Sequence, residues 1–140
     1  MTYAWLPRDC FDTKSNDEYR RWMNGTKRVR RPFPLFKDQE GKEPIKDEVE
    51  LSERAGKGVY ITREAHWAHC LFMLPKLPRA RNKGMTVDRT VASASHMKHC
   101  TNIFLNIDGA DLDPALDSLD HLDPVFVGFG FCVGFDSPWP

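Results

Sequence analysis

The 140-residue chain lacks a long apolar run, a signal-peptide pattern and an excess of charge of either sign. No segment approaches the roughly 20 apolar residues that are needed to span a bilayer. The first ten residues, MTYAWLPRDC, lack the basic and apolar blocks of a signal peptide. Acidic and basic residues balance at 20 each, so the net charge does not indicate binding to nucleic acid. The chain as given is therefore expected to be soluble, without nucleic acid among its partners.

Cysteine is also scarce, with four residues in the chain. That number is low for a small domain that relies mainly on disulfides. Cys10 and Cys132 lie near the two ends of the chain and are candidates to bond each other. Cys70 and Cys100 each directly follow a histidine, which places them beside any site that the histidines form.

Length and composition favour a single domain over residues 1–140. Ten prolines and nine glycines indicate frequent turns. We expect a mainly α fold with irregular loops and a few short strands. Proline and charge patterns predict loops over residues 37–53, with room for one helical turn, and over the basic residues 76–84. The expected strands cover residues 58–62 and 125–131, and the expected helices cover 17–23 after a cap at Ser15 or Asn16, 63–74 after a cap at Thr62, and a continuous stretch from a cap at Thr86 or Asp88 to Ile107.

What the sequence does contain is a repeated HxxHC unit, at residues 66–70 and 96–100, which holds four of the five histidines. Residues three apart on a helix lie on nearly the same face, so each unit can aim two imidazoles at one point. The short connection between the two expected helices favours an antiparallel helix pair. Such a pair would bring four imidazoles together, as in metal-binding helical bundles. The candidate metal ligands and catalytic residues are His66, His69, His96 and His99.

Several kinds of site are consistent with these units. Imidazole-rich sites bind copper, iron or zinc, and sulfur ligands nearby favour copper. Cys70 and Cys100 have two open roles, as soft metal ligands or as a disulfide that supports the site. A structural zinc ion held by two histidines and two cysteines is the main rival, although zinc fingers usually space their ligands differently. A chance repeat, with histidines that are merely hydrogen-bonded, is the remaining explanation. The carboxylates of Asp111 and Asp113 suggest calcium, but the EF-hand spacing is missing.

At these residues the sequence resembles the UstYa-like family of fungal secondary-metabolite oxidases. The family signature is a pair of HxxHC motifs a few dozen residues apart, which stand here as HWAHC and HMKHC. Leu71 also matches the HCL sequence that is usual in the family. The resemblance is specific over residues 58–107. It departs after the second motif, where the family often has an acidic residue and then Arg-Gln but this chain has Asn102, Leu105 and Asn106.

The resemblance implies a copper-dependent oxidase of mycotoxin or other secondary-metabolite biosynthesis, with zinc or iron as alternative metals and dioxygen as co-substrate. The implied substrate is a peptide or small molecule, and the reactions known in the family are oxidative cyclisation, hydroxylation, desaturation and halogenation. A disulfide between Cys70 and Cys100 would suit the secretory-pathway lumen, where the chain would lie if it is part of an anchored protein. The alternatives are a non-catalytic zinc-stabilised binding module or a non-redox cyclase with histidine as acid or base. The expected partners include a second copy of the chain, in a homo-oligomer. Candidates for an apolar substrate pocket, or else for the core, are Tyr60, Trp67, Phe129 and Phe131.

Overall fold

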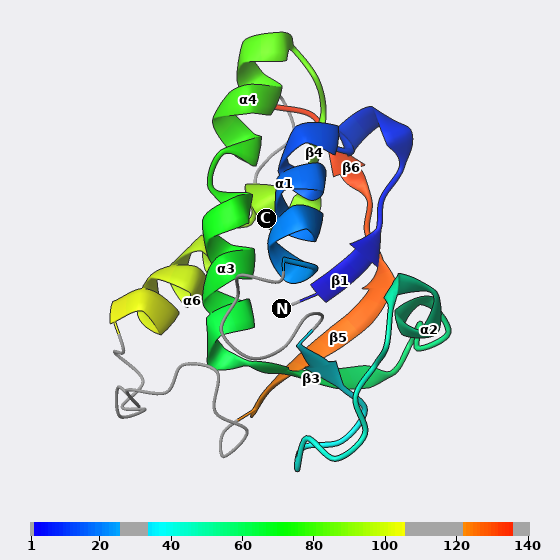
Figure 1. Cartoon of the computed structure of the whole chain (residues 1–140). Helices are drawn as coiled ribbons and strands as arrows, with labels where there is room; N and C mark the ends of the chain where they lie inside the picture. Colours follow the sequence, from blue (N-terminus) through cyan, green and yellow to red (C-terminus); the bar gives the residue numbers. More distant parts are fainter. Residues whose placement is uncertain (1, 26–33, 106–121, 136–140) are drawn as a thin grey trace.

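The computed structural model describes residues 2–25, 34–105 and 122–135 (Figure 1). About half of these residues are helical, and the rest form short strands and irregular loops, as the composition predicted. None of the described helices combines the length and the apolar character that crossing a membrane requires. The helices are η1 (Arg8–Cys10), α1 (Thr13–Met23), α2 (Glu48–Ser52), α3 (Arg63–Met73), α4 (Lys76–Lys83), α5 (Arg89–Ala92) and α6 (Ala94–Leu105). The strands are β1 (Thr2–Trp5), β2 (Leu35–Phe36), β3 (Gly58–Thr62), β4 (Val87–Asp88), β5 (Leu122–Phe129) and β6 (Cys132–Val133).

A four-stranded sheet in the order β1-β5-β3-β2 supports the helices. Strand β5 pairs in parallel with β1 and antiparallel with β3, and β2 pairs antiparallel with β3. The predicted strand over residues 125–131 is thus partly confirmed, because β5 begins earlier, at Leu122, and ends at Phe129. Strands β4 and β6 form a separate antiparallel pair. The sheet requires four segments far apart in the sequence, of which periodicity predicted only two.

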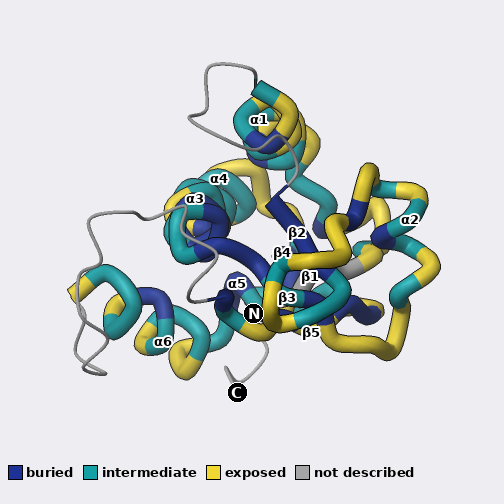
Figure 2. Tube along the Cα trace, turned by 60° about the horizontal axis from the view of Figure 1, so that its bottom comes forward, coloured by how far each residue is buried: buried dark blue, intermediate teal, exposed yellow. Residues whose placement is uncertain are grey.

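Helices α1 and α3 pack against the sheet, and α3 lies between α1 and α6 (Figures 1 and 2). The apolar core that joins them buries side chains from α1, α2, α3 and the strands, with the rings of Tyr19 and Trp22 packed against it. Burial of this apolar surface is the main force that holds the layers together. The core residues are Met23, Leu35, Ile45, Leu51, Val59, Ile61, Ala65, Val125 and Val127.

The junction between β3 and α3 positions the first HxxHC unit. Strand β3 ends at Thr62, whose hydroxyl accepts a hydrogen bond 3.3 Å long from the Ala65 amide and so caps the helix, as predicted. The helix ends at Met73, one residue before the predicted end, ahead of Pro75. Thr62 also pairs with Leu122 of β5. This register brings the start of β5 beside the first turn of α3.

The predicted loop over residues 76–84 is wrong, because residues 76–83 form helix α4. Pro78 lies within its first turn, where a backbone N–H has no partner inside the helix and proline is tolerated. Gly84 closes the helix with φ at 62°, the left-handed conformation that glycine adopts without strain. The predicted loop over residues 37–53 does include one short helix, α2.

The single helix that was predicted to run to Ile107 is divided at Ser93 into α5 and α6. Asp88 caps α5 by accepting a hydrogen bond 3.1 Å long from the Thr90 amide. Ser93 has extended backbone angles, and its hydroxyl accepts a hydrogen bond 3.3 Å long from the His96 amide. The serine side chain therefore competes with the helix and starts a new one. Ile107 itself lies outside the described residues.

The first helix also begins earlier than predicted, at Thr13. Its cap is Asp12, which accepts hydrogen bonds from the amide and the hydroxyl of Ser15 at 3.2 and 2.9 Å. It ends at Met23, as predicted, with Asn24 as its C-cap. A disulfide joins Cys10 to Cys132, so the two ends of the described chain are covalently linked.

Candidate metal centre

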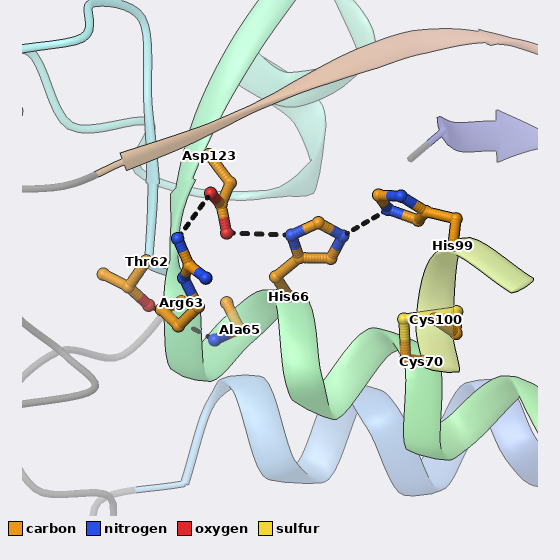
Figure 3. Close-up of polar contacts among 8 residues, drawn as sticks. All are labelled: Thr62, Arg63, Ala65, His66, Cys70, His99, Cys100 and Asp123. Atoms are coloured by element: carbon orange, nitrogen blue, oxygen red, sulfur yellow. Dashed lines mark hydrogen bonds and ion pairs between the residues drawn. A yellow bond between two sulfur atoms is a disulfide. The ribbon is translucent and has the colours of Figure 1, made fainter. Parts of the chain in front are cut away.

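The two HxxHC units lie on α3 and α6, which are joined by a disulfide between Cys70 and Cys100 (Figure 3). The Cα atoms of the two cysteines are 5.6 Å apart, and both residues are buried. Of the two roles that the sequence left open, the structure thus has the disulfide. A sulfur atom in a disulfide is not a thiolate, and the thiolate is the form that binds metal. The candidate ligands that remain are the histidines.

The four histidines form a continuous row of rings across the two helices. The ring centroids are 5.1 Å apart for His66 and His99, 6.1 Å for His99 and His96, and 5.9 Å for His96 and His69. Within the part of the chain that the structure describes, no three His, Cys, Asp or Glu side chains are already grouped around one metal position. The rings therefore form two cross-helix pairs in contact, His66 with His99 and His69 with His96.

Asp123 holds the His66 ring in place (Figure 3). His66 Nδ1 lies 2.8 Å from Asp123 Oδ2, and Arg63 contacts the other oxygen of the same carboxylate at 3.5 Å. An ionised carboxylate only accepts, so Nδ1 carries the proton. In a neutral ring Nε2 is then the lone-pair atom. His66 Nε2 lies 3.1 Å from His99 Nε2, which must donate.

Asp123 is a residue of this candidate site that the sequence did not reveal. It is 57 residues from His66 in the chain. Only the pairing of β5 with β3 brings it to α3, because Asp123 lies opposite Ile61, two residues before Arg63. No spacing rule in the sequence predicts that register.

Burial keeps two of the imidazoles neutral. The pKa of His69 lies well below its ordinary value of 6.5, first because the ring is desolvated and then because His96 is close. Desolvation also lowers the pKa of His96 to about 4. Neighbouring charges lower it by smaller amounts, whereas the backbone of Thr90 raises it. Near pH 7 both rings are therefore uncharged, and an uncharged imidazole has the lone pair that a metal requires.

This electrostatic state makes the metal-free protein sensitive to acid. Because the folded pKa values of His69 and His96 lie below those of the unfolded chain, the unfolded chain binds protons first as the pH falls below about 6.5. We expect the free energy of unfolding to fall between about pH 6.5 and 4. Urea unfolding in the presence of a chelator measures this slope. His96→Gln should flatten it, and an unchanged slope in that variant would contradict the assignment.

The histidines fit a metal ion by two observations. Two nitrogens bound about 2.0–2.1 Å from one ion lie roughly 2.9–3.4 Å apart, and the 3.1 Å between the Nε2 atoms of His66 and His99 falls in that range. Both ring nitrogens of His96 are buried, and neither makes a hydrogen bond of good geometry among the described residues, although the Thr90 backbone lies close enough to raise the pKa of the ring. Buried polar atoms without partners are rare in native proteins and call for an explanation such as an ion. An imidazole donor set suits copper, zinc and iron alike.

No family model, curated protein or solved structure matches this chain. The resemblance to UstYa-like oxidases therefore depends on the two HxxHC motifs and Leu71. Asp111 and Asp113, the candidate calcium ligands, lie outside the described residues.

Aromatic side chains flank the histidines on two sides. Tyr19 of α1 meets His69 edge-on, with centroids 6.4 Å apart, and Trp67 packs against Phe104 of α6. Tyr19 also lines a cavity of about 230 Å³ between α1, α2 and the sheet, whose other walls are mostly apolar. Phe129 and Phe131, two of the four aromatic residues expected in a pocket or the core, are not in the core. Their side chains are 79% and 50% exposed.

Proposed function

We propose that the protein is a copper-dependent oxidase of secondary metabolism that uses dioxygen to modify a peptide or small-molecule substrate. The observation that supports it best is the row of four imidazoles from two HxxHC units, with a nitrogen–nitrogen separation of 3.1 Å between His66 and His99 at one end of the row. Copper, when bound, would supply the one-electron chemistry with dioxygen that no side chain provides. The family resemblance of the two units supports copper over zinc and iron.

The metal would be held by His66 and His99, with His69 and His96 as the second pair of donors. Asp123 would keep the Nδ1 proton on His66 and so leave Nε2 as the donor atom. The neutral state of His69 and His96 would make both rings available near pH 7. The disulfide would hold the two helices at a fixed distance, so that ligand geometry is set before the metal binds.

The two helices would form an antiparallel pair across the site. His66 precedes His69 on α3, whereas their ring partners occur in the opposite order on α6, His99 with the first and His96 with the second. This reversed order supports antiparallel directions. The Cys70–Cys100 bond does not follow this order, so the proposed pair would be a crossed one, antiparallel in direction but with the helix axes at an angle.

An apolar or aromatic group of the substrate would bind in the cavity of about 230 Å³ beside Tyr19. The Tyr19 ring lines this cavity and also contacts the His69 ring, so it connects the cavity to the row of histidines. Binding sites for small molecules are commonly apolar with a few polar groups, and here Asn16 and the Arg20–Glu48 ion pair supply them.

A zinc site built from two histidines and two cysteines is disfavoured, because both cysteines are in the disulfide. A non-redox cyclase would require no metal at all. The metal content of the purified protein distinguishes these two possibilities from the oxidase.

The proposal is tested by elemental analysis of the purified chain after loading with copper or zinc, followed by a measurement of dioxygen consumption. We expect stoichiometric copper in the wild type and a loss of most of it in His99→Ala, because that variant removes one nitrogen of the 3.1 Å pair. Lys98→Ala, an exposed change on the same helix, is the matched control and should retain the metal.

If the protein binds zinc tightly and shows no dioxygen consumption that depends on copper, it is a structural zinc module and the oxidase proposal is wrong. A protein that binds neither metal would overturn the metal centre altogether. Equal unfolding midpoints for the two variants in the metal-free state would show that a loss of copper is not a loss of folding.

A further inference from the structure

A second cavity, of about 480 Å³, lies between the start of α1, helix α4 and the segment around β4. Its volume is in the range of small-molecule sites. None of the four histidines lines it. Its walls combine apolar groups such as Val87 and Val91 with charged groups, of which Asp12, Lys76, Arg79 and Asp88 are the ones that matter here.

Lys76, the first residue of α4, is partly buried and lines this cavity. Desolvation lowers the pKa of its amine, and the nearby guanidinium of Arg79 lowers it further, against the opposing effect of Asp88 and Asp12. Arg79 is held in position by Asp12, 3.3 Å away. A lysine that is desolvated and close to another cation is the usual form of an activated amine nucleophile.

Asp88 lines the same cavity, and its pKa is shifted in the opposite direction from that of Lys76. It is buried, and desolvation raises the pKa of its carboxyl group, although the Thr90 amide donates to Oδ1 at 3.1 Å. Lysine and aspartate thus share one cavity, where each is pushed toward its neutral form. When the surroundings shift the pKa values of two neighbouring groups in opposite directions, one group can act as base or nucleophile and the other as acid.

The rim of the cavity argues for an uncharged ligand. Its basic residues are nearly balanced by acidic ones, so it has no strong field that would select a phosphate or another multiply charged anion. A small ligand that reacts with an amine and bears no charge is an aldehyde or a ketone.

We propose that the cavity of about 480 Å³ binds a small aldehyde or ketone and that the Lys76 amine condenses with it to form a reversible imine. The nitrogen lone pair attacks the carbonyl carbon, a C–N bond forms as the C=O π bond breaks, and one of the two nitrogen protons moves to the carbonyl oxygen. The hydroxyl group of this carbinolamine then leaves as water with a proton from Asp88, and the nitrogen proton returns to Asp88 as the C=N bond is completed. One carbonyl compound and one amine give one imine and one water, with no oxidant or reductant.

The test is reductive alkylation of the full chain with propanal and cyanoborohydride near neutral pH, with the modification of each lysine followed by peptide mass spectrometry. Cyanoborohydride traps the imine by adding hydride to its carbon. We expect Lys76 to be modified at least about tenfold faster than Lys98, an exposed lysine of α6 that does not line the cavity. Modification of Lys76 at the rate of Lys98 or more slowly would overturn the proposal.

Asp88→Asn tests the proton donor. Asparagine can still accept from the Thr90 amide, so the cap of α5 is retained. We expect the modification of Lys76 to slow severalfold in this variant while that of Lys98 is unchanged, and an unchanged Lys76 rate would overturn the role of Asp88. The experiment requires no metal, so its outcome is independent of the oxidase proposal.

Discussion

Replacing both Cys10 and Cys132 with alanine is expected to lower the free energy of unfolding by about 4–5 kcal/mol. The two residues are 122 positions apart, so their disulfide closes a loop that includes nearly all of the chain. A cross-link stabilises mainly by restricting the unfolded chain, and the effect grows with the logarithm of loop length. Urea unfolding of the oxidised wild type and the double variant measures the difference.

The matched comparison is the double replacement of Cys70 and Cys100. Their separation of 30 residues gives a smaller loop term, about 3.5 kcal/mol. Both residues are fully buried, so loss of their sulfur atoms adds a packing cost. An unfolding free energy unchanged by the replacement of Cys10 and Cys132 would show that the unfolded chain is not restricted by that bond.

The two pairs are also expected to differ in their effect on the histidines. Only the Cys70–Cys100 bond joins α3 to α6 directly, whereas the other joins η1 to β6. Loss of the first bond should therefore weaken metal binding even at temperatures where the chain is folded.

Helix boundaries were predictable where a residue acts locally. Thr62 caps α3 with its own hydroxyl, and Asn24 ends α1, so both boundaries follow from residue type. Local signals were misleading where their position within the helix decides the outcome. Proline and charge predicted a loop around Pro78, yet this residue lies in the first turn of α4, where proline is tolerated. Ser93 lies inside an uninterrupted helical pattern, yet its hydroxyl starts α6.

The candidate site divides in the same way. The spacing within HxxHC predicts which histidines share a helix face, because helix geometry is local. The partner of His66 was not predictable, because it depends on the register of two strands 60 positions apart. The choice between thiolate and disulfide for Cys70 was also undetermined, since either is compatible with the spacing. Both features depend on contacts between residues far apart in the sequence, and the periodicity of the sequence does not predict such contacts.

Asp123→Ala is expected to weaken copper binding roughly 10- to 100-fold, the usual cost of removing a carboxylate that orients a metal-binding histidine. This expectation depends on the proposed copper site. Without the carboxylate, the His66 ring loses the 2.8 Å contact that fixes its Nδ1 proton, so the ring can rotate or change tautomer. Arg63 loses its ion-pair partner in the same variant. Competition with a chelator of known affinity measures the change.

Asp123→Asn separates orientation from charge. The asparagine oxygen can still accept from His66 Nδ1, but it no longer increases the basicity of the ring through a negative charge. We therefore expect an affinity between those of the wild type and Asp123→Ala. Asp47→Asn, which keeps the cap of the distant helix α2, is the control and should bind copper as the wild type does. The proton signals of His66 in the metal-free protein provide a second readout, because a change of tautomer would move them. If both Asp123 variants retained the wild-type affinity and tautomer, Asp123 would be only a partner of Arg63, and the orientation of His66 would have to come from the packing of α3.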